Sequence, residues 1–276
     1  MSVIAPSVRL PQLDASGRIR FYRVLLSEWT KLRSVRSTKW SLAAGFLLTI
    51  AFPIIFAFVT RSHWSSMSPD ERASRHPLDI ALAGVNVAQL AIAVLGVLLI
   101  SAEYSTGSIR STFTAVPKRL PVLWAKLGVF AVVSFALTLP AVIVSFYTSQ
   151  AILNRHHILQ TSISSPGVLR VIVGSALYVM GVGVFALALG AIIRNTAGGI
   201  SAFVGIFFVI PPLMNVLPLS WNNAISKWLP SEAGRQLFAL TRDPSRFAQW
   251  PSGAIFLGYC VLAIAIAAVL LVRRDA

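Results

Sequence analysis

Few residues in this sequence are of the types that carry out catalysis or bind metal ions. They lie outside the membrane-like segments or occur singly within them. The four histidines fall where loops are expected, at His63, His76, His156 and His157. The adjacent pair could touch a metal ion, but neighbouring side chains on a helix point in different directions. We therefore expect solvated loop histidines and no metal site. The one cysteine, Cys260, stands in an apolar run, which excludes an intrachain disulfide and a cysteine-based zinc motif.

The motifs that mark common enzyme classes are absent from the sequence. There is no Gly-Lys dipeptide, so a Walker A phosphate loop is excluded and the chain does not bind ATP in that way. The G-x-S-x-G and H-E-x-x-H patterns are missing as well. An enzyme of the membrane interior would need paired catalytic groups inside the apolar runs, and these runs contain none. We expect no enzymatic activity and no cofactor held by this chain.

Three amide side chains are the main polar exceptions in the apolar runs. Asn86 and Gln89 lie in the second run, and Asn215 lies near the outer end of the fifth span. Ion-coupled transporters usually carry carboxylates or lysines at the middle of the membrane, and their absence argues against a secondary transporter. The amides have two interpretations: they line a pathway, or they hydrogen-bond neighbouring helices to one another.

The overall composition is that of a membrane protein. Of the 276 residues, 56% are hydrophobic and 12% are charged, with a mean hydropathy of +0.74, whereas soluble domains are about 25% charged. Six runs lack Asp, Glu, Lys and Arg, and each reaches the roughly 20 residues that cross a membrane as a helix. We predict an all-α polytopic membrane protein with about six transmembrane helices, at 40–60, 80–101, 127–148, 170–193, 196–211 and 251–272.

The outer side is expected to carry short helices. The fifth run contains three prolines, Pro211, Pro212 and Pro218. Proline breaks the backbone ladder of a helix, so we expect the fifth span to end near Ile210. The segment that follows, before the last span, should form short helices with Trp221 and Trp228 at headgroup depth. Another short helix is predicted after Ser68, because Glu71 lies three residues further on and completes a capping box.

The distribution of basic residues predicts the orientation. The formal net charge is +15, but the lysines and arginines stand between the apolar runs, a pattern that sets membrane topology and is not typical of nucleic-acid binding. With an even number of spans, 15 of the 24 fall on the side of the termini and 9 on the other. We expect a protein of the plasma membrane with both termini in the cytoplasm, its basic face against membrane lipids.

The chain before the first span divides into two parts. Residues 1–19 are expected to form a disordered cytoplasmic tail, ahead of a single transmembrane domain at 20–276. Within that domain, residues 20–38 are amphipathic at helical spacing and rich in arginine and lysine. Their apolar stripe consists of Phe21, Leu25, Trp29, Leu32 and Val35. We predict a basic helix that lies in the inner membrane interface.

The segment after the second span begins at Glu103, which follows 23 uncharged residues and so stands at the inner membrane boundary. The next residues combine hydroxyls that favour a helix start, a glycine that permits close backbone approach, and an apolar pair four residues apart. They are Ser105, Thr106, Gly107, Ser108, Ile109, Arg110, Phe113 and Thr114. This segment is either a coupling helix that fits a partner or an ordinary interfacial turn in which Glu103 pairs with Arg110.

Four segments carry a resemblance to a known family. They are SEWTKLRSVRST at 27–38, EYSTGSIRSTFTAVPKR at 103–119, LGAIIRNTAGGI at 189–200 and WLPSEAGRQL at 228–237. Together, in order and spacing, they resemble an ABC-2-type transporter permease of the kind common in actinobacterial export systems. The second segment is similar to the E-x-x-x-G-[ST] pattern of that family through Glu103, Gly107 and Ser108. The chain departs in having Ser108 where threonine is frequent and in the polar outer loop at 149–168.

The resemblance implies a permease subunit of an ATP-driven ABC exporter, which forms the pathway for efflux, including multidrug or antibiotic resistance. It implies two copies of a separate ATP-binding subunit, which would hold ATP and Mg, and a second permease subunit, the same or homologous. Coupling would involve Glu103, Tyr104, Thr106, Gly107, Ser108, Ile109, Arg110 and Phe113. The interfacial helix would contribute Glu28, Trp29, Lys31, Leu32 and Arg33. The alternative is a membrane-embedded scaffold, or an immunity or resistance protein, without transport of its own.

Overall fold

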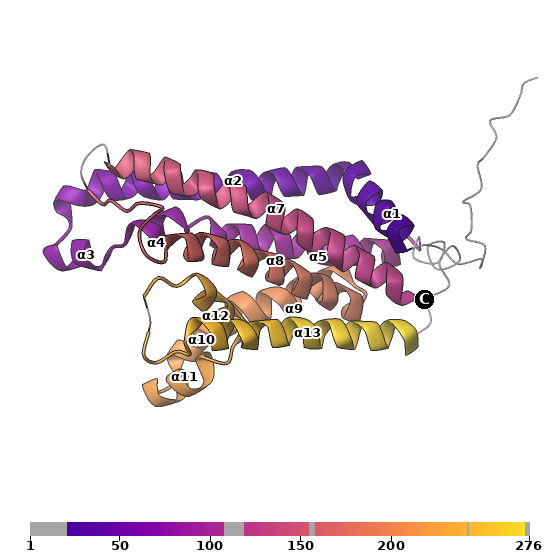
Figure 1. Cartoon of the computed structure of the whole chain (residues 1–276). Helices are drawn as coiled ribbons and strands as arrows, with labels where there is room; N and C mark the ends of the chain where they lie inside the picture. The colour runs from indigo at the N-terminus through magenta and orange to yellow at the C-terminus, as the bar shows by residue number, and fades with distance from the viewer. Residues whose placement is uncertain (1–20, 108–118, 155–157, 242, 274–276) are drawn as a thin grey trace, which may run out of the picture.

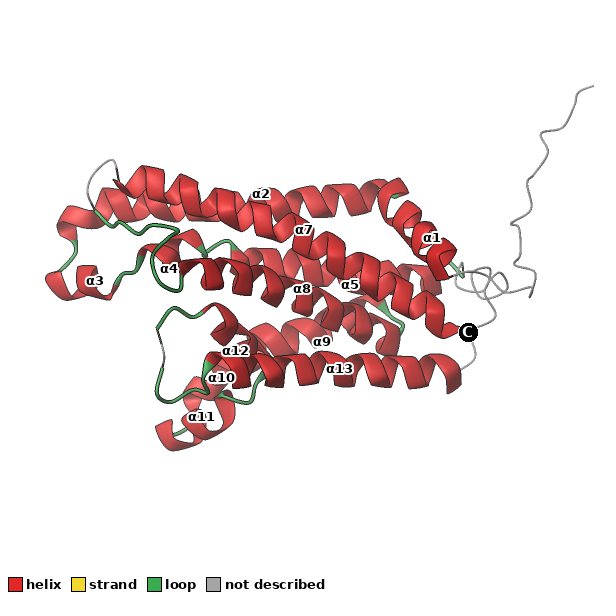
Figure 2. Cartoon of the chain, in the orientation of Figure 1, coloured by secondary structure: helices red, strands yellow, loops and turns green. Residues whose placement is uncertain are grey.

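The computed structural model describes residues 21–107, 119–154, 158–241 and 243–273. These residues form a bundle of helices, and no strand occurs among them (Figures 1 and 2). Six of the described helical segments are long and apolar enough to cross a membrane: Arg36–Ser66, Pro77–Ser105, Arg119–Asn154, Val168–Ile193, Thr196–Val216 and Gln249–Arg273. The prediction of an all-α, multi-pass membrane protein is confirmed.

The long helices run side by side, and short ones join them at one end (Figure 1). The first half of the chain contains α1 (Phe21–Ser34), α2 (Arg36–His63), η1 (Trp64–Ser66), α3 (Pro69–Ser74), α4 (Pro77–Ala81), α5 (Val85–Ser105) and α7 (Arg119–Asn154). The second half contains α8 (Val168–Ile193), α9 (Thr196–Val204), η2 (Gly205–Val209), α10 (Ile210–Leu213), η3 (Met214–Val216), α11 (Leu219–Ser226), α12 (Pro230–Arg235), η4 (Gln236–Phe238) and α13 (Gln249–Arg273). We call the end that holds α1 and the last turn of α13 the α1 end, and the opposite end the α3 end.

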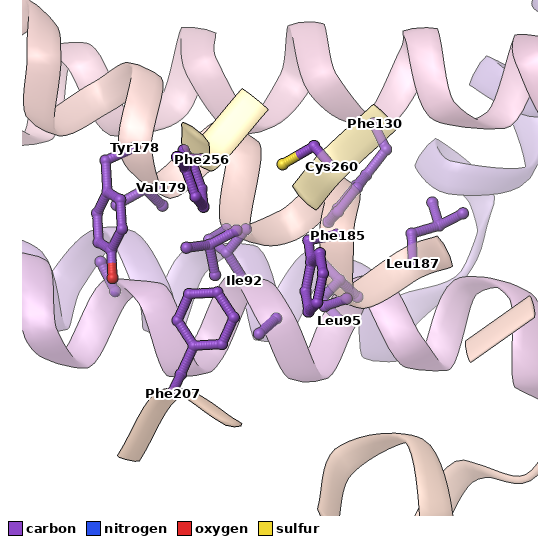
Figure 3. Packing of buried hydrophobic residues seen from close by; sticks show 14 of the residues in the cluster. Ile92, Leu95, Phe130, Tyr178, Val179, Phe185, Leu187, Phe207, Phe256 and Cys260 are labelled. Carbon is purple, nitrogen blue, oxygen red and sulfur yellow. The ribbon is translucent and has the colours of Figure 1, made fainter. Parts of the chain in front are cut away.

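The core of the bundle forms around α8. In the most apolar stretch of this span, 61% of the residues are buried. The helices α5, α7 and α13 pack against it, and Ile92, Phe130 and Phe185 are among the side chains that fill the contacts (Figure 3). A Cβ atom placed on Gly96 of α5 would lie 2.6 Å from the carbonyl oxygen of Gly183 of α8. Glycine is therefore required for this close approach, which is a common device in membrane helix packing.

A proline inside α2 is compensated by a contact with α7. Pro53 has no N–H, so the carbonyl oxygen of Thr49 lacks its usual partner within the helix. Ser145 Oγ of α7 donates a hydrogen bond to that oxygen at 2.8 Å, in a buried position. A Cβ atom placed on Gly84 would lie 2.1 Å from the same carbonyl oxygen of Thr49. Glycine is therefore needed in the short connection between α4 and α5. These contacts join the first three spans.

The predicted interfacial helix is divided in the structure. Val35 takes extended backbone angles of φ −75° and ψ 119°, so α1 ends before it and the residues after it belong to α2. The chain turns at this point from the direction of α1 into that of the first span (Figure 1). The amphipathic helix is therefore one turn shorter than the predicted range of 20–38.

The fifth span follows a longer helical path than the prolines predict. The path continues beyond Ile210 to Val216, instead of ending near Ile210. It does so through a π-helical turn at Gly205–Val209, after which Pro211 and Pro212 occupy the first turn of α10. In a first turn the backbone N–H is not needed for the helix ladder, so proline is tolerated there. The short helices α11 and α12 then follow before the last span, as predicted.

The capping box predicted between the first and second spans is present. The N–H of Glu71 donates to Ser68 Oγ at 3.3 Å, and the N–H of Ser68 donates to Glu71 Oε2 at 2.8 Å. Pro69 occupies the first turn of α3, where its fixed φ suits the helix. The short sequence motif thus suffices to predict this helix at the α3 end.

Candidate functional site

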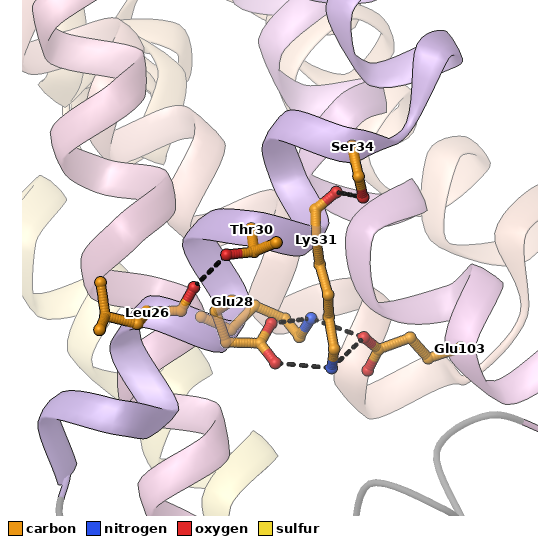
Figure 4. Close-up of polar contacts among 7 residues, drawn as sticks. Leu26, Glu28, Thr30, Lys31, Ser34 and Glu103 are labelled. Atoms are coloured by element: carbon orange, nitrogen blue, oxygen red, sulfur yellow. Dashed lines mark hydrogen bonds and ion pairs between the residues drawn. The ribbon is translucent and has the colours of Figure 1, made fainter. Parts of the chain in front are cut away.

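Four charged side chains from three helices meet at the α1 end. Lys126 Nζ of α7 lies 2.6 Å from Glu28 Oε2 of α1 and 2.9 Å from Glu103 Oε1 of α5. Lys31 Nζ of α1 lies 2.7 Å from Glu28 Oε1 and 3.1 Å from Glu103 Oε1. The ammonium of Lys31 stands between the two carboxylates (Figure 4). We call Glu28, Lys31, Glu103 and Lys126 the ion-pair network.

The network is largely withdrawn from solvent. The side chains of Glu28 and Lys126 are 3% and 6% exposed, that of Glu103 is 14% exposed, and that of Lys31 is 39% exposed. Moving a single charge into such a site costs several kcal/mol, and only close pairing with hydrogen bonds offsets that cost. Two carboxylates and two ammonium groups make the network formally neutral. Each charged group therefore has an oppositely charged partner that offsets part of this cost.

The pKa values of the two charged residues of α1 reflect this pairing. Burial acts to raise the pKa of Glu28, but Lys126 and Lys31 outweigh it, and the pKa lies below its ordinary value of 4.5. Burial acts to lower the pKa of Lys31, but Glu28 and Glu103 outweigh it, and the pKa lies above its ordinary value of 10.5. Both groups are therefore charged at neutral pH.

The local sequence explains why Glu28 reaches the network. Val24 and Glu28 are four residues apart and share one face of α1. Val24 packs against Val122 and Ala125 of α7 in a small apolar cluster. Because Lys126 directly follows Ala125, this apolar contact brings the lysine close to Glu28.

The residues predicted on α1 divide by burial. Glu28 and Lys31 join the network, and Leu32 is 7% exposed. Trp29 is 44% exposed, and Arg33 is exposed as well. The buried face of α1 is thus only partly the predicted apolar stripe, because a charged residue with partners takes a central place in it. Placement of the exposed face in a membrane interface stays a prediction.

Lys126 is a functional candidate that sequence reasoning misses. The criterion of an uncharged run makes this lysine the boundary of the third span and predicts a loop before it. In the structure α7 begins at Arg119, about two turns earlier. Lys126 therefore lies within the helix, where Glu28 and Glu103 pair with it. The available signal was a lone lysine and a lone glutamate on the inner boundaries of consecutive spans.

The C-terminal end of α5 and the two residues after it contain the other described residues of the predicted coupling segment. The guanidinium of Arg194 lies 4.8 Å from the centre of the Tyr104 ring, and Thr106 Oγ1 donates to the carbonyl oxygen of Ala102 at 2.8 Å. Gly107 has φ +71°, the left-handed conformation in which glycine commonly ends a helix. The remaining predicted residues lie outside the described part of the chain: Ser108, Ile109, Arg110 and Phe113. The coupling helix and the alternative pair of Glu103 with Arg110 stay predictions.

Of the three amide residues, Gln89 acts between helices. The hydroxyl of Tyr178 on α8 donates to Gln89 Oε1 on α5 at 2.5 Å, and both side chains are 1% exposed. This is the second of the two interpretations, a hydrogen bond between neighbouring spans. Gln89 therefore belongs to the core of this chain.

The other two amides lie at the α3 end and contact the short helices there. Arg235 Nη2 donates to Asn86 Oδ1 at 3.4 Å, and Asn222 Nδ2 donates to Asn215 Oδ1 at 3.2 Å. Asn86 lines a cavity of about 420 Å³, Asn215 lines one of about 430 Å³, and Arg235 lines both. A role of the two amides in a pathway stays a prediction.

The described residues contain no group of three His, Cys, Asp or Glu side chains that could hold a metal ion. No family model matches the chain, and a search of curated proteins finds no match. The class that fold and site define is a multi-pass helical membrane protein with a buried ion-pair network at one end of its bundle.

Proposed function

We propose that this chain is the permease subunit of an ATP-driven ABC exporter in the plasma membrane, with both termini in the cytoplasm. One observation carries the proposal: the ion-pair network joins α1 to the ends of α5 and α7. These are the segments that resemble the partner-contacting parts of the family. The excess of lysine and arginine on the side of the termini supports the orientation.

The chain supplies spans but no means of hydrolysing ATP. Because the sequence has no Walker A loop, the energy would come from a separate ATP-binding subunit, present in two copies, that holds ATP and Mg. Trp29 is exposed on α1, and α5 ends beside α1 at the same end of the bundle. Both would face that subunit.

Movement of the partner would reach the spans through the network. A force on α1 or on the segment after α5 acts on Glu28 or Glu103, whose carboxylates share both lysines. The helix α5 would pass this movement to α8, because Gly96 and Gly183 bring the two backbones into close contact. The network would therefore couple the partner to the core of the permease.

The pathway would lie between this permease and a second one, identical or homologous. The first and fifth spans are the least buried of the six. In their most apolar stretches, 22% and 17% of the residues are buried within one chain. On the fifth span Ser201 is exposed, and a Cβ atom on Gly205 would meet nothing within 4 Å. Small residues four apart on an open face permit close approach of another helix. These two spans are our candidates for the interface between the two permeases.

The test is co-expression with each Walker A protein that a neighbouring gene encodes, followed by purification through a tag on the permease. Co-purification, with ATP hydrolysis in proteoliposomes that rises with transported substrate, would support the proposal. A chain that confers the same resistance when the Walker lysine of every such partner is replaced would instead favour the scaffold or immunity protein.

A further inference from the structure

A cavity of about 430 Å³ lies beside the ion-pair network, between α1, α2, α5 and α7. Its volume is within the roughly 300–1,000 Å³ of ordinary ligand sites. Most of its lining is apolar, from Leu32, Val35, Leu95, Leu98, Leu99, Ala102 and Val129. The polar lining consists of the network itself with Ser37, Thr38 and Ser41. The cavity thus offers both charged and apolar contacts to one occupant.

On α5 the charged lining lies at one end of the cavity and most of the apolar lining lies further along the helix. Glu103 and Leu95 both line the cavity from α5 and are eight residues apart, which corresponds to roughly 12 Å of helix. The charged groups stand at the end of the apolar span, where lipid headgroups lie, and the leucines extend into the depth of the acyl chains. Ser37 and Ala102, which line the cavity, are exposed, so it opens to the surface between α2 and α5.

One carboxylate oxygen of the network has no donor. Glu103 Oε1 accepts hydrogen bonds from Lys31 and Lys126, whereas Glu103 Oε2 is buried and has no hydrogen-bond partner among the described residues. A buried acceptor without a donor is unfavourable, so a donor that reaches this oxygen is stabilised there. A ligand with an N–H donor would supply it.

We propose that this cavity binds a zwitterionic phospholipid with a primary amine headgroup, of the phosphatidylethanolamine type. Its ammonium group donates to Glu103 Oε2, its phosphate lies toward Lys31 and Ser37, and an acyl chain lies along Leu98. The charge of the network favours a zwitterion, because two carboxylates and two ammonium groups are already balanced. A net anionic headgroup would bring uncompensated charge to buried carboxylates. The bound lipid would stabilise the position of α1 beside the spans, and this role does not depend on whether the chain is a transporter.

The direct test uses phosphatidylethanolamine with a photoactivatable diazirine in one acyl chain. The full chain is reconstituted into lipid nanodiscs with this probe, irradiated and mapped by mass spectrometry. We expect adducts concentrated on the peptide that contains Leu95–Leu99 and on Val129. Adducts spread over lipid-facing positions such as Leu262 of α13, which is 57% exposed, without enrichment at the cavity would overturn the proposal.

A matched pair of variants tests the cavity itself. Leu98→Trp fills it, and Leu90→Trp places the same side chain at an exposed position of the same helix, outside the cavity. Lipids that remain with each purified chain are identified by mass spectrometry. We expect Leu98→Trp to lose the retained phosphatidylethanolamine and Leu90→Trp to keep it. Equal retention in both variants, or equal retention of phosphatidylglycerol by the unchanged protein, would contradict the proposed site.

Discussion

Lys126 of α7 donates a hydrogen bond to Glu103 of α5 at 2.9 Å, across 23 residues of sequence. The same ammonium group also bonds Glu28 of α1, so one side chain ties three helices together. Because Lys126 is 6% exposed, the bonds form where water competes little for the charges. The position of α1 beside the bundle therefore depends on Lys126 and on the pair of Lys31 with Glu103, as well as on apolar packing.

Replacing that lysine should destabilise the fold more than replacing an exposed one. Lys126→Ala leaves the buried Glu28 carboxylate with only Lys31 as a partner, and loss of one member of a buried pair typically costs about 3–5 kcal/mol. Lys39→Ala, at an exposed position of α2, should change stability by less than about 0.5 kcal/mol. Reversible unfolding in mixed micelles measures both. Equal stability of the two variants would show that the network contributes nothing.

The pKa shifts predict a broad plateau of stability with pH. The pKa of Glu28 is lowered, so its contribution is complete above about 4.5 and is lost as the pH falls through the folded-state pKa. The pKa of Lys31 is raised, so its contribution is complete below about 10.5 and is lost as the pH rises through the folded-state pKa. Thermal unfolding of the protein and of Glu28→Gln measures the acid limb. The variant should lose less stability in acid; parallel curves would refute the assignment.

The contact between α5 and α8 should tolerate no side chain at Gly96. In Gly96→Ala the new Cβ would lie 2.6 Å from the carbonyl oxygen of Gly183, a backbone atom that cannot move aside alone. Overpacking of this kind costs about 1–3 kcal/mol. Gly258→Ala on α13 is the control, since its Cβ meets nothing within 4 Å and alanine favours helix by about 0.5–1 kcal/mol. A comparison of unfolding temperatures should give shifts of opposite sign.

The six spans and the capping box at Ser68 are predictable because they depend on local pattern: uncharged length in one case, two residues three apart in the other. The network is not, because Lys126 and Glu28 are 98 residues apart and nothing local shows that they meet. The extension of the fifth span to Val216 depends on a π-helical turn, for which the sequence has no clear signal. Long-range pairing and irregular helix thus account for what the sequence leaves open.

The orientation is open to a direct labelling test. In a Cys260→Ser background, single cysteines at Ser66, Ser162 and Ser245 should react with an impermeant thiol reagent in intact cells. Ser66 is the last residue of the first span, and Ser162 and Ser245 lie between spans, all on the predicted outer side. A cysteine at Ser2 should react only after the cells are opened. Labelling of the Ser2 position in intact cells, with protection of the other three, would reverse the proposed topology.

Coupling to an ATP-binding subunit predicts variants that fold but do not work. Glu103→Ala removes one carboxylate that holds both lysines, and Gly107→Val places a branched side chain at φ +71°, a conformation that valine strongly disfavours. Each should leave the chain inserted in the membrane, although Glu103→Ala should lower its unfolding temperature because Lys126 loses one of its two carboxylate partners. Each should reduce export and substrate-stimulated ATP hydrolysis by roughly 5- to 150-fold, the range that corresponds to coupling energies of 1–3 kcal/mol.

The matched control for these variants is Arg75→Ala, an exposed residue near the α3 end, which should change neither rate. Membrane levels separate coupling from stability, because a merely structural role of Glu103 would lower transport only in proportion to the amount of inserted chain. The proposal requires that hydrolysis by the assembled complex in the absence of substrate stay unchanged, so that only the stimulated part is lost. If Glu103→Ala and Gly107→Val export at the unmutated rate, the segment after α5 is an ordinary interfacial turn. In that case the network serves only to hold α1 in place.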